Sequence, residues 1–172
     1  MNSNIYYFLT LNNFYSNYLN EPVSFLGSLA FMILLIVLPF SIWTAIVSKK
    51  SSIISFLVSL TNIILASQLA IRWIQTSHFP VSNLYESLCF LTWAFTLFQI
   101  LLAKFFSSAL IHAILTPFSL LIIAFASFAL PPELQQSSSL VPALRSNWLM
   151  MHVTVIMLSY AALLIGSLLS FA

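Results

Sequence analysis

The stretch LVPALRSNWLMMHVTVIMLSYAALLIGSLLSFA, residues 140–172, decides the class of this protein. A polar segment changes there into a run of mostly apolar residues that begins at Trp148 and continues to the last residue. Because a transmembrane helix needs about 20 such residues, the run is long enough to cross a bilayer. If Ser146 or Asn147 caps the helix, His152 lies about one and a half turns inside it, at the depth of the membrane surface. A transmembrane protein would hold a flat, half-apolar ligand at such a place.

The composition agrees with a membrane protein and excludes several other classes. Of the 172 residues, 61% are hydrophobic and 5% are charged, whereas soluble domains carry about 25% charge. The net charge of +2 is too small to indicate nucleic acid binding. Cys89 is the only cysteine, which excludes a disulfide framework and a cysteine zinc cluster. The absence of aspartate excludes a Ser/His/Asp triad, and two glycines are too few for a phosphate-binding glycine loop.

Hydropathy predicts an all-α fold, a polytopic transmembrane helical bundle of about five spans. The expected spans cover about residues 25–47, 53–74, 84–103, 109–130 and 148–172. Residues 1–24 form a separate N-terminal segment in this interpretation, and residues 25–172 form the transmembrane helical domain. Pro39 and Pro117 fall inside the first and fourth spans, where we expect kinks.

The lysines predict how the spans are oriented. The pair at residues 49–50 lies between the first two spans, and Lys104 lies between the third and fourth. Both loops should therefore face the cytoplasmic or stromal side. This places residues 1–24, His78 and His152 on the outer side. Arg72 and Arg145 also fall on the outer side and reduce the difference in positive charge between the two sides.

Four residues near the outer surface could bind a ligand, and each has a simpler alternative. His152 could ligate a metal such as haem iron, or could pair with a neighbouring helix or a lipid headgroup. Trp148 could wall an apolar ligand or anchor the helix in the aromatic belt. Arg145 could pair with a haem propionate or be a solvated loop cation. His78 is the second candidate ligand, unless it is merely solvated.

The remaining polar residues favour structural roles. Asn83-Leu84-Tyr85-Glu86 resembles a capping box, with Asn83 as N-cap. Arg72 lies a short loop away from Glu86, and we expect the two to pair and close the hairpin of the second and third spans. His112 is expected to form hydrogen bonds within the bundle, and Cys89 to pack in it.

Small residues recur every four positions in the last span, at Ala162, Gly166 and Ser170. This spacing lets another helix approach closely. We therefore expect a packing ridge, either for a continuation of the chain or for a partner.

Two stretches closely resemble one membrane family. They are HFPVSNLYESLCFLTW, residues 78–93, and residues 140–170 of the stretch quoted first. The family is CcsA, the haem-handling subunit of the system II cytochrome c synthase, which is related to the bacterial ResC proteins. The cyanobacterial and plastid forms are the most similar. The other spans resemble the family in pattern only.

The resemblance implies a role in cytochrome c biogenesis. Family members work with a CcsB (ResB-type) membrane partner and bring haem b to the lumenal or periplasmic face. Apocytochromes c then add the two thiols of a CxxCH motif to the haem vinyl groups. Two outer histidines beside a tryptophan-rich WWD segment ligate the iron, and the first of them falls on His152. The implied location is a thylakoid membrane, cyanobacterial or plastid, with His152 on the lumenal side.

Family members continue for roughly as many residues again, through the WWD segment and a second outer histidine. We therefore expect residues 25–172 to be the N-terminal part of a longer domain, in a fragment or a truncated gene product. The full-length family forms part of a holocytochrome c synthase, and this chain alone should be inactive. Two alternatives stay open: a polytopic transporter with Arg72, Glu86 and His112 as its polar lining, and a non-catalytic membrane assembly subunit.

Overall fold

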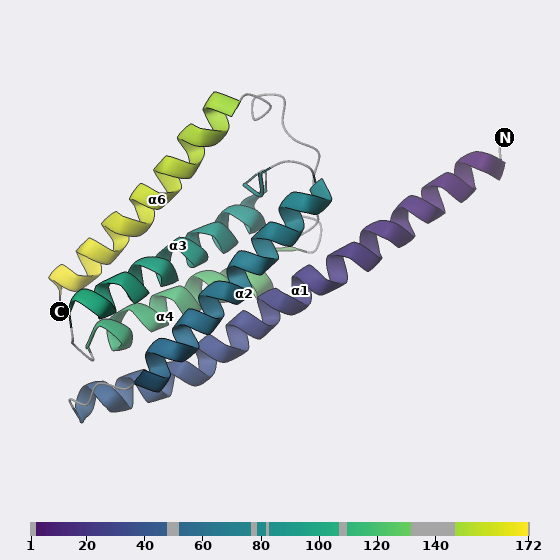
Figure 1. The fold of residues 1–172 in the computed structure, drawn as a ribbon. Coiled ribbons are helices and arrows are strands. Elements are labelled where there is room, and N and C mark those ends of the chain that lie inside the picture. Colours follow the sequence, from purple (N-terminus) through teal and green to yellow (C-terminus); the bar gives the residue numbers. More distant parts are fainter. Residues whose placement is uncertain are drawn as a thin grey trace.

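The chain folds into long helices, and the part of it that the structure describes contains no strand. The computed structural model describes residues 3–47, 52–76, 79–81, 83–106, 110–131 and 147–171, with side chains from residue 23 onward and, in the last range, from residue 148. The elements are α1 (Ser3–Ile46), α2 (Ser52–Thr76), α3 (Leu84–Phe105), α4 (Leu110–Ala124), the π-helix η1 (Phe125–Ala129) and α6 (Asn147–Ser170) (Figure 1). The predicted all-α fold is confirmed.

The five predicted spans are also confirmed. Helices long and apolar enough to cross a membrane cover Val23–Ile46, Ser52–Thr76, Leu84–Phe105, Leu110–Ala129 and Trp148–Ser170. The helix α1 that contains the first span begins earlier, at Ser3, and continues through most of the N-terminal segment 1–24. Residues 3–21 contain neither glycine nor proline, so nothing strongly helix-breaking interrupts them.

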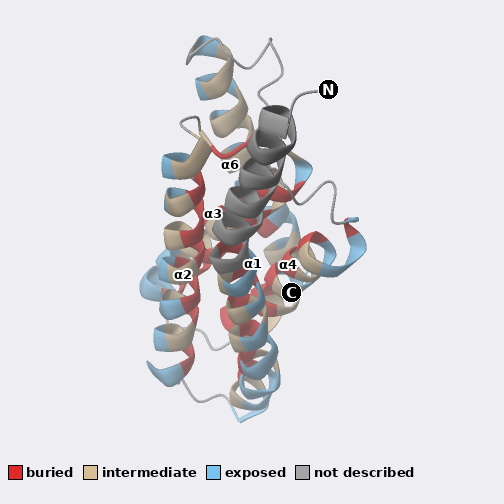
Figure 2. Ribbon diagram, turned by 90° about the vertical axis from the view of Figure 1, so that its right-hand side faces the viewer, coloured by how far each residue is buried: buried red, intermediate tan, exposed pale blue. Residues whose placement is uncertain are grey.

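The helices pack around α3. It contacts α2, α4 and α6, while α1 packs against α2 and α4. In the most apolar stretch of α3, 44% of the residues are buried, whereas only 11% are buried in the corresponding stretch of α6. In Figure 2 the buried positions gather on the facing sides of the helices. The helix that carries His152 therefore lies at the edge of the bundle and leaves most of its surface uncovered.

Proline does not end either predicted span that contains it. Pro39 lies within α1 and Pro117 within α4. The irregularity in the fourth span comes about two turns after Pro117, where the helix widens into η1. The kinks expected at the two prolines stay predictions.

Gly27 of α1 lies where three helices meet. A Cβ atom on Gly27 would be 2.9 Å from the Tyr85 hydroxyl of α3 and 3.3 Å from Nε2 of Gln68 on α2. A side chain here would push apart two groups that hydrogen bond to each other at 2.9 Å. By contrast, a Cβ on Gly166 of α6 would meet nothing within 4 Å.

These two glycines make a matched pair for measuring the packing. We expect Gly27→Ala to destabilise the bundle by about 1–2 kcal/mol, because it overpacks a buried contact. Gly166→Ala should be neutral or stabilising by about 0.5–1 kcal/mol, since alanine favours a helix that has room for it. Thermal unfolding of both variants in detergent measures the difference. Equal melting temperatures for the two variants would contradict the close approach at Gly27.

Candidate functional site

His152 lies on the side of α6 that faces away from the bundle. The inward side is formed by partly buried apolar residues such as Val153, Met157 and Leu158, which pack against the core. Helical spacing turns His152 to the other side, together with the three residues at positions 148, 151 and 155. The four side chains line a shallow pocket of about 260 Å³. The pocket wall is apolar apart from the imidazole.

The imidazole of His152 is available for a ligand. The side chain is exposed, and no described residue forms a hydrogen bond or an ion pair with it. Pairing with a neighbouring helix, one of the two alternatives, is therefore not seen among the described residues. The described residues contain no group of three or more His, Cys, Asp or Glu side chains that could hold a metal ion. A single imidazole beside an apolar wall is suited to a cofactor that brings most ligands of its own metal and needs one from the protein.

Trp148 shares the pocket with His152, and it is 82% exposed. Its position fits both a wall for a ligand and an anchor at the membrane surface. Arg145 and His78, the other two candidate residues, lie outside the described residues. Met151 and Val155, which were not predicted from the sequence, also line the pocket and are 67% and 58% exposed. Their spacing from His152 on one helix face was the available signal.

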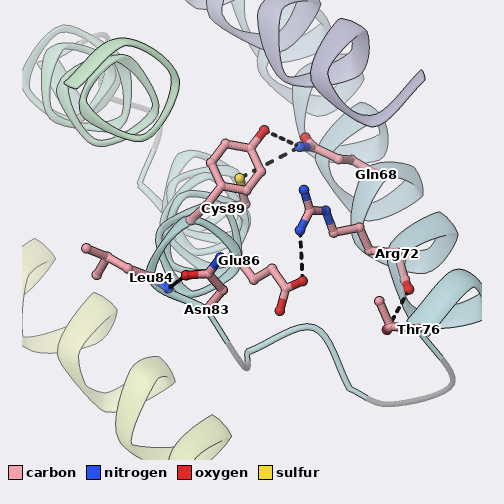
Figure 3. A network of polar contacts seen from close by, with 8 residues as sticks. Gln68, Arg72, Thr76, Asn83, Leu84, Glu86 and Cys89 are labelled. Carbon is pink, nitrogen blue, oxygen red and sulfur yellow. Dashed lines mark hydrogen bonds and ion pairs between the residues drawn. The ribbon is translucent and has the colours of Figure 1, made fainter. Parts of the chain in front are cut away.

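A buried ion pair joins α2 to α3 at the end of the bundle where α6 begins. Nη1 of Arg72 donates to Oε1 of Glu86 at 2.9 Å, with the side chains 5% and 0% exposed (Figure 3). The guanidinium carbon lies 5.0 Å from the centre of the Tyr85 ring, a cation–π distance. The predicted pair is confirmed, and it closes the hairpin between the two helices.

Two other structural interpretations near this hairpin, Asn83 as N-cap and Cys89 as a packing residue, are confirmed as well. The backbone N–H of Leu84 donates to Oδ1 of Asn83 at 2.7 Å, so Asn83 caps α3, while the return bond of Glu86 in the capping box stays a prediction. Cys89 is 1% exposed and packs in the core. Its sulfur accepts a long contact of 3.8 Å from Nε2 of Gln68, a residue for which the sequence predicted no role.

His112 of α4 forms hydrogen bonds within the bundle, as predicted. Nδ1 lies 3.1 Å from Nε2 of Gln99 on α3, and Nε2 lies 3.0 Å from Oγ of Ser55 on α2. The Gln99 amide also donates to Oγ1 of Thr116 at 3.1 Å. Both ring nitrogens of His112 are therefore occupied, which sets it apart from His152.

Comparison with known proteins identifies the family. Residues 81–172, which include α3, α4 and α6, match the family model described as cytochrome C assembly protein. The cytochrome c biogenesis protein CcsA of Prochlorococcus marinus (strain SARG / CCMP1375) is 65% identical over 150 residues, which are 87% of this chain and 48% of the relative. This chain belongs to the cytochrome c assembly protein family.

Other members of the family named CcsA match a similar share of the chain at 58% identity. The protein of Prochlorococcus marinus (strain NATL2A) is 58% identical over 91% of this chain and 50% of its own length. That of Synechococcus sp. (strain WH7803) is 58% identical over 89% of this chain and 48% of its own length. The chain thus spans about half the length of the relatives that it matches. His152 lies within the part that matches the cytochrome C assembly family.

The ion pair between Arg72 and Glu86 can be tested by comparing single and double substitutions. Glu86→Leu should destabilise the protein by about 3 kcal/mol, because it leaves a guanidinium buried in an apolar bundle without its counter-charge. Arg72→Met combined with Glu86→Leu should cost less than either single change, since it buries no charge. Unfolding in detergent of the four proteins of this cycle gives the coupling energy. A coupling energy near zero would show that the pair is incidental to the packing of α2 on α3.

Proposed function

We propose that this chain takes part in cytochrome c biogenesis. It provides one axial ligand and one apolar wall of a haem site at the lumenal or periplasmic face of the membrane. The observation that carries the proposal is the imidazole of His152, which has no partner among the described residues and lies in an apolar pocket beside Trp148. Membership of the cytochrome C assembly family supports it, as do relatives named cytochrome c biogenesis proteins. Haem b is the substrate that this site presents.

The chemistry of haem suits this pocket. Its faces are apolar and its propionates are anionic, so it fits at a boundary between lipid and water. The apolar pocket can take the porphyrin face, and His152 can ligate the iron. Arg145 is proposed to pair with a propionate, and His78 is a weaker second candidate for the iron. The described residues line only one side of such a site, so its other side must come from groups outside them.

The proposed division of labour needs no nucleophile from this chain. The thiols of the CxxCH motif of an apocytochrome c add to the haem vinyl groups, and the membrane protein positions the haem. A CcsB-type membrane protein is the proposed partner. The proposed location is a thylakoid membrane with His152 on the lumenal side, and the cyanobacterial source of the relatives is consistent with it.

His152 can be tested by haem binding to the purified chain. We expect His152→Ala to weaken haem retention on the order of tenfold and to change the absorbance spectrum, because the iron loses an axial ligand. Added imidazole should restore the original spectrum in this variant. Trp148→Ala should weaken binding without changing the ligation spectrum.

His112→Gln is the matched control, because its imidazole is occupied within the bundle and should not contribute to the spectrum. An unchanged spectrum and affinity in His152→Ala would overturn the assignment of the ligand. Failure of the unsubstituted chain to bind haem, also in complex with its membrane partner, would favour the alternative of an assembly subunit without a haem site.

A further inference from the structure

A second cleft lies at the opposite end of the bundle, where α2 begins and α3 ends. Its volume is about 350 Å³. We call it the serine cleft, because its lining includes hydroxyls from one face of α2; the lining residues are Ser52, Ser55, Ser59, Ile100, Ala103 and Lys104. The serines are spaced as i, i+3 and i+7, which places all three on the same side of the helix.

The charge of the serine cleft is positive. Lys104 is exposed in the last turn of α3, and the lining contains no acidic residue. Among the described side chains the only carboxylate is that of Glu86, which pairs with Arg72 at the other end of the bundle. The first-turn backbone N–H groups of α2 add positive potential at the same end, since they have no partners within the helix. The cleft is therefore complementary to an anion.

A buried histidine orients one of the hydroxyls in the serine cleft. Nε2 of Gln99 lies 3.1 Å from Nδ1 of His112, and Oγ of Ser55 lies 3.0 Å from Nε2 of the same ring. In the tautomer that carries the ring proton on Nε2, the imidazole donates to Oγ of Ser55 and leaves the hydroxyl proton of Ser55 for a ligand in the cleft. Gln99 is fully buried and His112 is 6% exposed.

We propose that the serine cleft binds a phosphate group at the membrane surface. Lys104 supplies the counter-charge, and the hydroxyls of Ser52 and Ser55 donate hydrogen bonds to the phosphate oxygens. The volume of the cleft exceeds that of a bare phosphate, which favours a phospholipid headgroup as the source. Exposed apolar residues beside the serines, Ile53 at 70% and Phe56 at 66%, can contact its acyl chains.

The experiment measures how fast Lys104 is acylated by an amine-reactive reagent in the purified chain, with mass spectrometry as the readout. The probes are short-chain phosphatidylglycerol, phosphatidylcholine of the same chain length, and inorganic phosphate. Protection by phosphatidylglycerol but not by inorganic phosphate is the expected result, and it assigns the phosphate to a lipid. Equal protection by inorganic phosphate would support the site with a free phosphate as its ligand. No protection by any probe would overturn the proposal.

Variants separate a specific site from general charge attraction. The affinity for phosphatidylglycerol, followed by native mass spectrometry, should fall about fivefold in Lys104→Gln, which removes one charge near the surface. Ser55→Ala should weaken it by a similar factor through the loss of one hydrogen bond. Lys104→Arg should retain binding.

The matched control removes a hydroxyl elsewhere. Ser159→Ala removes an exposed hydroxyl that donates to its own helix at the carbonyl of Val155. This control should bind like the unsubstituted chain. A loss in Lys104→Gln with no loss in Ser55→Ala would show general charge attraction and overturn the proposal. Helix content by circular dichroism verifies that each variant is folded.

Discussion

The ion pair between Arg72 and Glu86 is the interaction that the packing of this bundle depends on. In an apolar bundle a lone charge is far more costly than in water, so the two must meet. Their meeting sets how α2 lies against α3, because sliding either helix by one turn would bury a charge without its partner. The Tyr85 ring, 5.0 Å from the guanidinium, extends this contact, and its hydroxyl meets α1 at Gly27. Three helices are thus held in register at one place.

The position of α6 depends indirectly on how α1, α2 and α3 pack together. Its apolar residues Val153, Met157 and Leu158 pack on a core to which α1–α4 and η1 contribute, and α6 itself contacts α3 and α4. The opposite side of α6 carries His152 and also the small residues Ala162, Gly166 and Ser170, all of them exposed. The predicted packing ridge and the proposed haem site therefore share one uncovered surface. A helix or partner that covers the small residues would also lie beside the pocket of His152 and could form its second wall.

Much of this architecture could be predicted from the sequence, since hydropathy specifies spans and charges in apolar surroundings must pair. This reasoning predicts the five spans, the cap at Asn83, the pair of Arg72 with Glu86 and the hydrogen bonding of His112 within the bundle. The side of α6 that faces the bundle was not, because apolar residues surround this helix on all sides. The serine cleft was not predictable either. It depends on Ser55 lying across from Lys104, which only the packing of α2 against α3 determines.

The hydrogen bonds of His112, and their absence at His152 among the described residues, explain why only His152 of the two is a candidate ligand. Serine and threonine hydroxyls in these spans mostly donate to carbonyls of their own helix, as Thr61 and Thr92 do. They therefore need no acceptor on a neighbouring helix. Ser55 instead meets His112 across helices, and Gln99 takes the other ring nitrogen. Ligation of iron by His112 would break a hydrogen bond in the buried bundle and leave its partner unsatisfied, at a cost of about 1–3 kcal/mol. The proposed ligation by His152 would break none among the described residues.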